Sequence, residues 1–135
     1  MRDRNRVWLL VSVMLVIALG LASRRPGVPG FVLAYAGDTL WGVLFFLLSA
    51  LVWPRGSALS LAASAIAITE SIELSELYQG EWALRLRATR LGGLLLGHAF
   101  SWSDVLCVFV GGALAALLDA IWGRVARTSA GTTPG

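Results

Sequence analysis

The sequence predicts an all-α membrane protein, a four-span helix bundle in which residues 1–127 form a single transmembrane domain. Hydrophobic residues make up 57% of the chain and its mean hydropathy is +0.75. Soluble domains are roughly 45–50% apolar, so this composition is typical of an integral membrane protein. The apolar residues also fall into runs separated by short polar segments, and several runs place charged residues near the same end.

Four of these runs are long enough to cross a bilayer, which needs about 17–25 helical residues. The expected spans cover residues 7–23, 31–53, 58–77 and 105–122. Tryptophans support these limits, because indole rings favour headgroup depth. Trp8, Trp53 and Trp122 fall at one expected interface, and Trp82 and Trp102 fall at the other.

Three shorter segments need separate interpretations. Residues 91–100 hold ten residues and three glycines, which cover about half of the hydrocarbon core, so a re-entrant or interfacial segment is expected between the third and fourth spans. Residues 128–135 are small and polar and are expected to be a disordered tail. The basic leader before the first run also fits a signal peptide, with cleavage near Ala22. An uncleaved span is favoured because the rest of the chain is itself multispanning.

Charge and composition exclude several functions. The net charge is +3, but the arginines stand singly or in pairs at segment ends and form no basic stripe with aromatic residues, so nucleic acid is not an expected partner. The single cysteine, Cys107, cannot form an intramolecular disulfide. His98 has no ligand at a suitable spacing, and no phosphate-binding loop is present, so no metal or cofactor is expected.

Arginine positions predict the orientation. With both termini and the loop after Trp53 on one side, that side holds Arg2, Arg4, Arg6, Arg55, Arg124 and Arg127, against five arginines on the other. Positive residues favour the cytoplasmic face, so both termini are expected in the cytoplasm and the protein in a bacterial inner (cytoplasmic) membrane. Asp119 is expected to pair locally with Arg124 rather than to join a polar pathway.

Carboxylates at three-residue spacing line the third span. Glu70, Glu73, Glu76 and Gln79 form an i, i+3 stripe on one helix face. Arg85, Arg87 and Arg90 follow in the next connection and supply opposite charges. Charges inside a membrane need partners, so Glu76 is expected to pair with Arg87, and Glu73 with Arg90 as the second choice.

The expected topology brings further charges to the same face. Arg24 ends the first span, Asp38 lies about 10 Å into the second, and Asp104 opens the fourth, where it can cap a helix N-terminus. The candidate ligand-binding set is therefore Arg24, Asp38, Glu73, Glu76, Gln79, Arg87, Arg90 and Asp104. The alternative is a structural ion-pair network that fixes helix register.

Several short motifs resemble a known family. Leu21–Arg24 (LASR), Tyr35–Trp41 (YAGDTLW), Glu76–Gln79 (ELYQ) and Phe100–Asp104 (FSWSD) are similar to those of small four-helix bacterial membrane proteins of unknown function, the DUF2809 type. More distantly, the chain resembles VanZ-like membrane proteins, whose family name is linked to glycopeptide-antibiotic tolerance. That wider pattern has an Asn one turn after the Asp, where this chain has Val108. The resemblance implies one site formed by Arg24, Asp38, Glu76, Gln79, Arg87 and Asp104.

The functional expectation is an outward-facing polar pocket that binds a small polar or amphiphilic envelope ligand, such as a lipid headgroup. Membrane lipid is the expected partner, and the chain is also compatible with a homo-oligomer. One alternative is an intramembrane enzyme acting on a lipid or envelope precursor, with Glu76 or Asp38 as general base. The other is a structural or transport subunit. No catalytic residue is assigned by the sequence.

Overall fold

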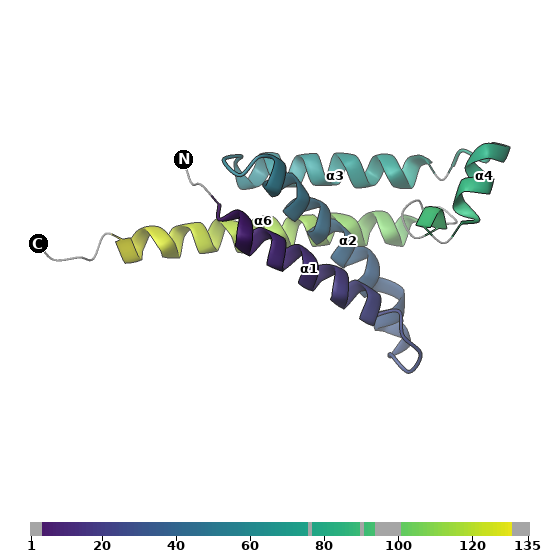
Figure 1. The fold of residues 1–135 in the computed structure, drawn as a ribbon, viewed down its shortest axis with the longest axis horizontal. Helices are drawn as coiled ribbons and strands as arrows, with labels where there is room; N and C mark the ends of the chain where they lie inside the picture. Colours follow the sequence, from purple (N-terminus) through teal and green to yellow (C-terminus); the bar gives the residue numbers. More distant parts are fainter. Residues whose placement is uncertain (1–3, 76, 90, 94–100, 131–135) are drawn as a thin grey trace, which may run out of the picture.

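The computed structural model describes residues 4–75, 77–89, 91–93 and 101–130, with side chains up to residue 124. Within these residues the chain is helical and contains no strand (Figure 1). The helices are α1 (Arg6–Ala22), α2 (Gly30–Val52), α3 (Ala58–Ser75), α4 (Glu81–Arg87) and α6 (Trp102–Ala130). The all-α prediction is thus correct for the described part of the chain.

Three of the described helices, not four, are long and apolar enough to cross a membrane: α2, α3 and the Trp102–Arg124 part of α6. The expected first span corresponds to α1, which has 17 residues and falls short of the others. At 1.5 Å per residue it reaches about 26 Å, less than the roughly 30 Å hydrocarbon core. Between 17% and 28% of each long apolar segment is buried inside the protein, so most of its surface is available to lipid.

Helix α2 lies at the centre of the arrangement and packs against α1, α3 and α6, while α3 also packs against α6. A buried apolar cluster joins these helices near the α2–α3 turn; it includes Leu9, Phe46, Ala50, Leu61, Ala62, Ala65 and Ala115. Figure 1 shows α1 and α2 diverging from α3 towards the opposite end, where α4 lies. The core therefore holds one end of the molecule together, and the helices separate at the other.

Glycines allow α2 and α6 to cross at backbone contact. A Cβ atom on Gly42 would overlap the carbonyl oxygen of Val108, and one on Gly111 would overlap that of Thr39. Small residues permit such an approach where lipid gives no hydrophobic drive for helix association. Asp38 lies one turn before Gly42, and Asp104 lies one turn before Val108. The crossing thus brings these two carboxylates to the same end of the helix pair.

The ends of several elements differ from the expected limits. Helix α4 was not expected, although Glu81 in its first turn and Arg85 and Arg87 in its last turn suit the helix dipole. Helix α6 continues to Ala130, so residues 128–130 are helical rather than part of a disordered tail, whereas residues 131–135 lie outside the described residues. Of the predicted re-entrant or interfacial segment, only residues 91–93 are described, and they are helical.

Candidate functional site

A guanidinium group lies against the backbone of α2 at the diverging end of the molecule. Arg24 follows α1 directly, after Ser23 has ended that helix by donating its backbone N–H to Leu19. A Cβ atom on Gly37 would lie 3.5 Å from Nε and 3.6 Å from a terminal nitrogen of Arg24. The absence of a side chain at Gly37 therefore leaves room for Arg24 beside the residue that precedes Asp38.

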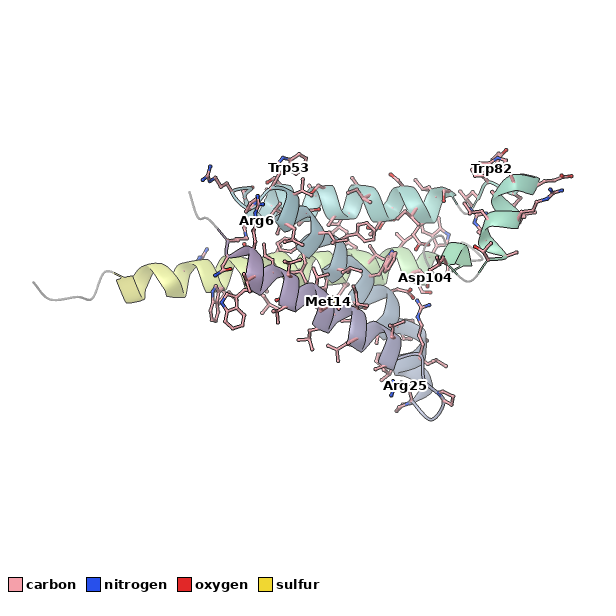
Figure 2. All side chains as sticks on the ribbon, viewed as in Figure 1. Arg6, Met14, Arg25, Trp53, Trp82 and Asp104 are labelled. Atoms are coloured by element: carbon pink, nitrogen blue, oxygen red, sulfur yellow. The ribbon has the colours of Figure 1, made fainter. Side chains whose placement is uncertain are left out.

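Asp38 is partly buried and lies close enough to Asp104 and to Arg24 for both charges to act on it. Three expected site residues, from the end of α1, from α2 and from α6, therefore lie near one another. Figure 2 labels Asp104 at the diverging end of the molecule. Two carboxylates and one guanidinium give this described group a net charge of −1.

Asp104 is held by the start of α6. It lies in the first turn of the helix rather than at the predicted N-cap, and it accepts a 3.0 Å hydrogen bond from the hydroxyl of Ser103. The hydroxyls of Ser101 and Ser103 are 2.7 Å apart and extend the polar surface. The positive end of the helix dipole stabilises a carboxylate at this position.

A small cavity of about 80 Å³ lies between α1 and α2 and leads up to the guanidinium. Its walls are mainly apolar and come from Val16, Ile17, Gly20, Leu21, Leu40, Trp41 and Leu44, with Arg24 and Gly37 at one end. The two helices run antiparallel, so the cavity follows the helix pair inwards from Arg24. The arrangement combines the charged Arg24 with this apolar cavity, which is called the apolar groove below.

Arg87 belongs to α4 and has a different environment, because its side chain reaches the end of α3. The residue is 4% exposed, and its terminal nitrogens donate hydrogen bonds of 2.6 Å to the carbonyl of Ser75 and 2.9 Å to that of Tyr78. Its Nε makes no hydrogen bond to a described residue. Arg87 therefore satisfies the Ser75 carbonyl, which the last turn of α3 leaves without an intrahelical partner, and the Tyr78 carbonyl in the connection that follows.

The predicted glutamate–arginine pairs lie partly outside the described residues. Glu76 and Arg90 are not described, so the Glu76–Arg87 and Glu73–Arg90 pairings stay predictions. Glu73 is buried in α3, and Gln79 is exposed before α4. Of the expected set, Arg24, Asp38 and Asp104 are described near one another, while Glu73 and Arg87 are described at the end of α3.

Three other charged residues of this region lie outside the α1–α2 cavity. Glu81 and Arg85 form an exposed pair at 3.6 Å within α4. Glu70 lies in a groove between α3 and α6 lined by Trp102, Phe109 and other apolar side chains, not in the α1–α2 cavity. Of the described members of the stripe, Glu70 therefore lines this groove, and Glu73 is buried within α3.

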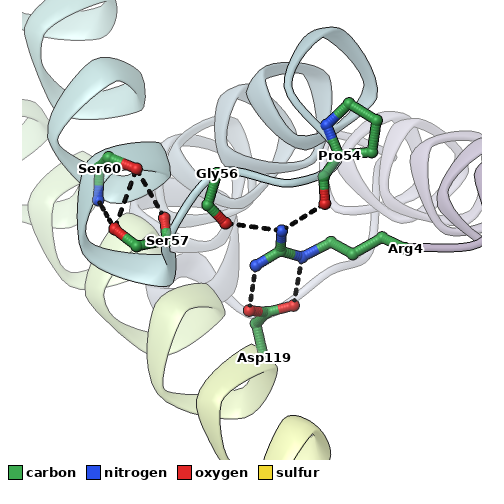
Figure 3. A network of polar contacts seen from close by, with 6 residues as sticks. All are labelled: Arg4, Pro54, Gly56, Ser57, Ser60 and Asp119. Carbon is green, nitrogen blue, oxygen red and sulfur yellow. Dashed lines mark hydrogen bonds and ion pairs between the residues drawn. The ribbon is translucent and has the colours of Figure 1, made fainter. Parts of the chain in front are cut away.

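Sequence reasoning missed one ion pair at the opposite end of the molecule. Arg4 donates from Nε and from a terminal nitrogen to the two carboxylate oxygens of Asp119, at 2.8 and 2.6 Å. Its other terminal nitrogen donates to the carbonyls of Pro54 and Gly56, both at 2.8 Å (Figure 3). The hydrogen bond to Asp119 raises the pKa of Arg4. No local pattern indicates this pair, because its members are 115 positions apart.

A metal centre is not formed by the described side chains, among which no three His, Cys, Asp or Glu residues gather. His98, the histidine considered from sequence, lies outside the described residues. The polar groups of the site, among the described residues, are therefore carboxylates, a guanidinium and hydroxyls.

Three described helices are long and apolar enough to cross a membrane, and they surround a charged site. These features are typical of a helical membrane protein. The family model described as "Protein of unknown function (DUF2809)" matches residues 27–112, more than half of the chain, so the protein belongs to this family. The match includes Asp38, Arg87 and Asp104 but begins after Arg24. No solved structure matches the chain. The more distant likeness to VanZ-like proteins stays a prediction.

Proposed function

We propose that this protein binds a zwitterionic amphiphile of the bacterial cell envelope, in the inner membrane and with both termini in the cytoplasm. The observation that carries the proposal is the approach of Asp38, Asp104 and Arg24 at the open end of an apolar groove. In this view α1 lies in the membrane against α2 as a fourth apolar helix and forms one wall of the ligand groove.

The charges of these residues suit a headgroup that carries both a positive and a negative charge. Arg24 offers a guanidinium, which pairs with phosphate through two parallel hydrogen bonds. Asp38 and Asp104 offer two carboxylates to an ammonium group. Charged residues inside a membrane are costly and are retained mainly where they serve a ligand or a pathway.

The groove suits the apolar part of the same ligand. Leu40, Trp41 and Leu44 of α2 face Val16 and Ile17 of α1 along the cavity. An acyl chain placed there would extend inwards while its headgroup remains at Arg24. The proposed ligand class is therefore a phospholipid with an amine headgroup, for which phosphatidylethanolamine is the probe.

One observation favours an enzyme as the second candidate. Asp38 and Asp104 are near each other in different surroundings, one within α2 and the other at a helix N-terminus. Two carboxylates in unlike environments can divide the roles of general acid and general base. An enzyme would convert the bound lipid, whereas a binding protein would release it unchanged.

Native mass spectrometry of the detergent-purified protein tests the proposal. The wild type should retain phosphatidylethanolamine in preference to phosphatidylglycerol, which lacks the amine. Asp38→Asn and Asp104→Asn should each lose this preference, because they remove charge and keep the side-chain size. Glu81→Gln, an equivalent change on the exposed face of α4, is the control. Wild-type lipid retention in both Asp variants would contradict the proposal, and a changed lipid mass after incubation would favour the enzyme.

A further inference from the structure

A second groove lies at the opposite end of the molecule, beside the α2–α3 turn. It has a volume of about 970 Å³, and its walls include Arg4, Arg6, Trp53, Arg55 and Ser60. The described lining contains three arginines and no carboxylate. Its charge is thus opposite to that of the Arg24–Asp38–Asp104 group. Figure 2 labels Arg6 and Trp53 at this end, away from Asp104.

One of the three arginines has a structural role. Arg4 is almost fully enclosed, with 8% of its side chain exposed, and its charge is balanced by Asp119 of α6. Its bonds to the carbonyls of Pro54 and Gly56 fix the turn between α2 and α3 (Figure 3). A 2.9 Å hydrogen bond from the Gly56 N–H to the Trp53 carbonyl closes the same turn.

The fixed turn sets the positions of the other two arginines. Arg55 stands between the two residues whose carbonyls Arg4 binds, and Arg6 follows Arg4 by two residues at the start of α1. Both are exposed, and both line the same groove. The Arg4–Asp119 pair therefore fixes the backbone from which both arginines line this groove before any ligand arrives.

The remaining walls indicate a ligand at headgroup depth. Trp53 is 63% exposed and Val52 is 70% exposed, and both line the groove beside the arginines. Tryptophan favours the membrane–water interface. The hydroxyl of Ser60, which shares hydrogen bonds with Ser57, adds a polar group at the start of α3.

We propose that this groove binds the headgroup phosphate of an anionic phospholipid, with Arg6 and Arg55 as its ligands. Guanidinium groups match phosphate oxygens in geometry as well as charge. The apolar wall at Val52 and Trp53 favours a phosphate attached to a lipid over free inorganic phosphate. This site is separate from the proposed amphiphile site and does not depend on it.

Lipid titration followed by native mass spectrometry tests this assignment with the full chain. Phosphatidylglycerol should bind more tightly than phosphatidylcholine, which carries no net charge. An arginine near a charged membrane surface contributes about fivefold in affinity, so Arg6→Gln with Arg55→Gln should weaken phosphatidylglycerol binding by about 25-fold. The matched control is Arg25→Gln with Arg85→Gln, which removes the same charge from exposed residues at the other end of the molecule.

Three outcomes would overturn the proposal. Equal losses in the two double variants would show that only net charge matters. Displacement of the lipid by equimolar inorganic phosphate would assign the site to free phosphate instead. Unchanged phosphatidylglycerol binding by Arg6→Gln with Arg55→Gln would also contradict it, because the proposal assigns the headgroup phosphate to these two guanidinium groups.

Discussion

Arg4 and Asp119 are 115 positions apart and form an ion pair through two hydrogen bonds, at 2.8 and 2.6 Å. Only 8% of the Arg4 side chain and 16% of the Asp119 side chain are exposed. The pair connects the segment before α1, the α2–α3 turn and the later part of α6. It stabilises the end of the molecule at which the chain enters α1 and at which α6 leaves the bundle (Figure 1).

The first prediction concerns the energy of this pair. Arg4→Met and Asp119→Asn should each lower the free energy of unfolding, because each leaves a partly enclosed charge or polar group without its main partner. The double variant should cost less than the sum of the single changes by about 0.5–3 kcal/mol. Thermal unfolding in detergent measures the cycle, and strict additivity would show that the two residues do not interact.

The second prediction concerns the α2–α6 crossing. Gly42→Ala and Gly111→Ala should each destabilise the protein by about 1–3 kcal/mol, because the new methyl group would overlap a carbonyl oxygen of the other helix. Gly20→Ala is the matched control, since no atom lies within 4 Å of its added Cβ. That change should be neutral or stabilising, because alanine favours helix. Equal melting temperatures for all three variants would rule out the close crossing.

The third prediction tests Arg87 as a cap for α3. Arg87→Gln should destabilise the protein by about 1–3 kcal/mol, because the carbonyls of Ser75 and Tyr78 lose buried charged donors. Arg85→Gln should change the melting temperature little, since Arg85 is exposed and its pair with Glu81 is weak. Hydrogen exchange at the end of α3 should increase in the first variant alone. Unchanged exchange there would contradict the capping role.

The fourth prediction concerns topology. The connection after α1 and helix α4 lie at one end of the molecule, and the α2–α3 turn lies at the other (Figure 1). In a Cys107→Ala background, single cysteines at Arg25 and Glu81 should react with a membrane-impermeant thiol reagent in intact cells, whereas one at Ser57 should react only after lysis. Labelling at Ser57 alone would invert the orientation, and labelling at only one of Arg25 and Glu81 would separate the two connections.

The length of an apolar run predicted α2 within one residue at each end, because a long run without charges near its ends has few alternatives in a membrane. The expected first span, residues 7–23, also agrees with α1 within one residue at each end, but its 17 residues place α1 below the three helices that are long enough to span. Helix α4 was missed because its seven residues are amphipathic and too few for a periodic pattern.

Local sequence by itself determined which residues are costly to leave in a membrane, and so identified Arg24, Asp38 and Asp104 as candidates. Only the tertiary structure decided that these three approach one another, because the glycine-mediated crossing of α2 and α6 sets the distance between their helices. It also decided that Arg87 caps a helix and that Arg4 binds Asp119. Such partners depend on helix packing in three dimensions, and spacing along the chain carries no information about contacts between residues so far apart.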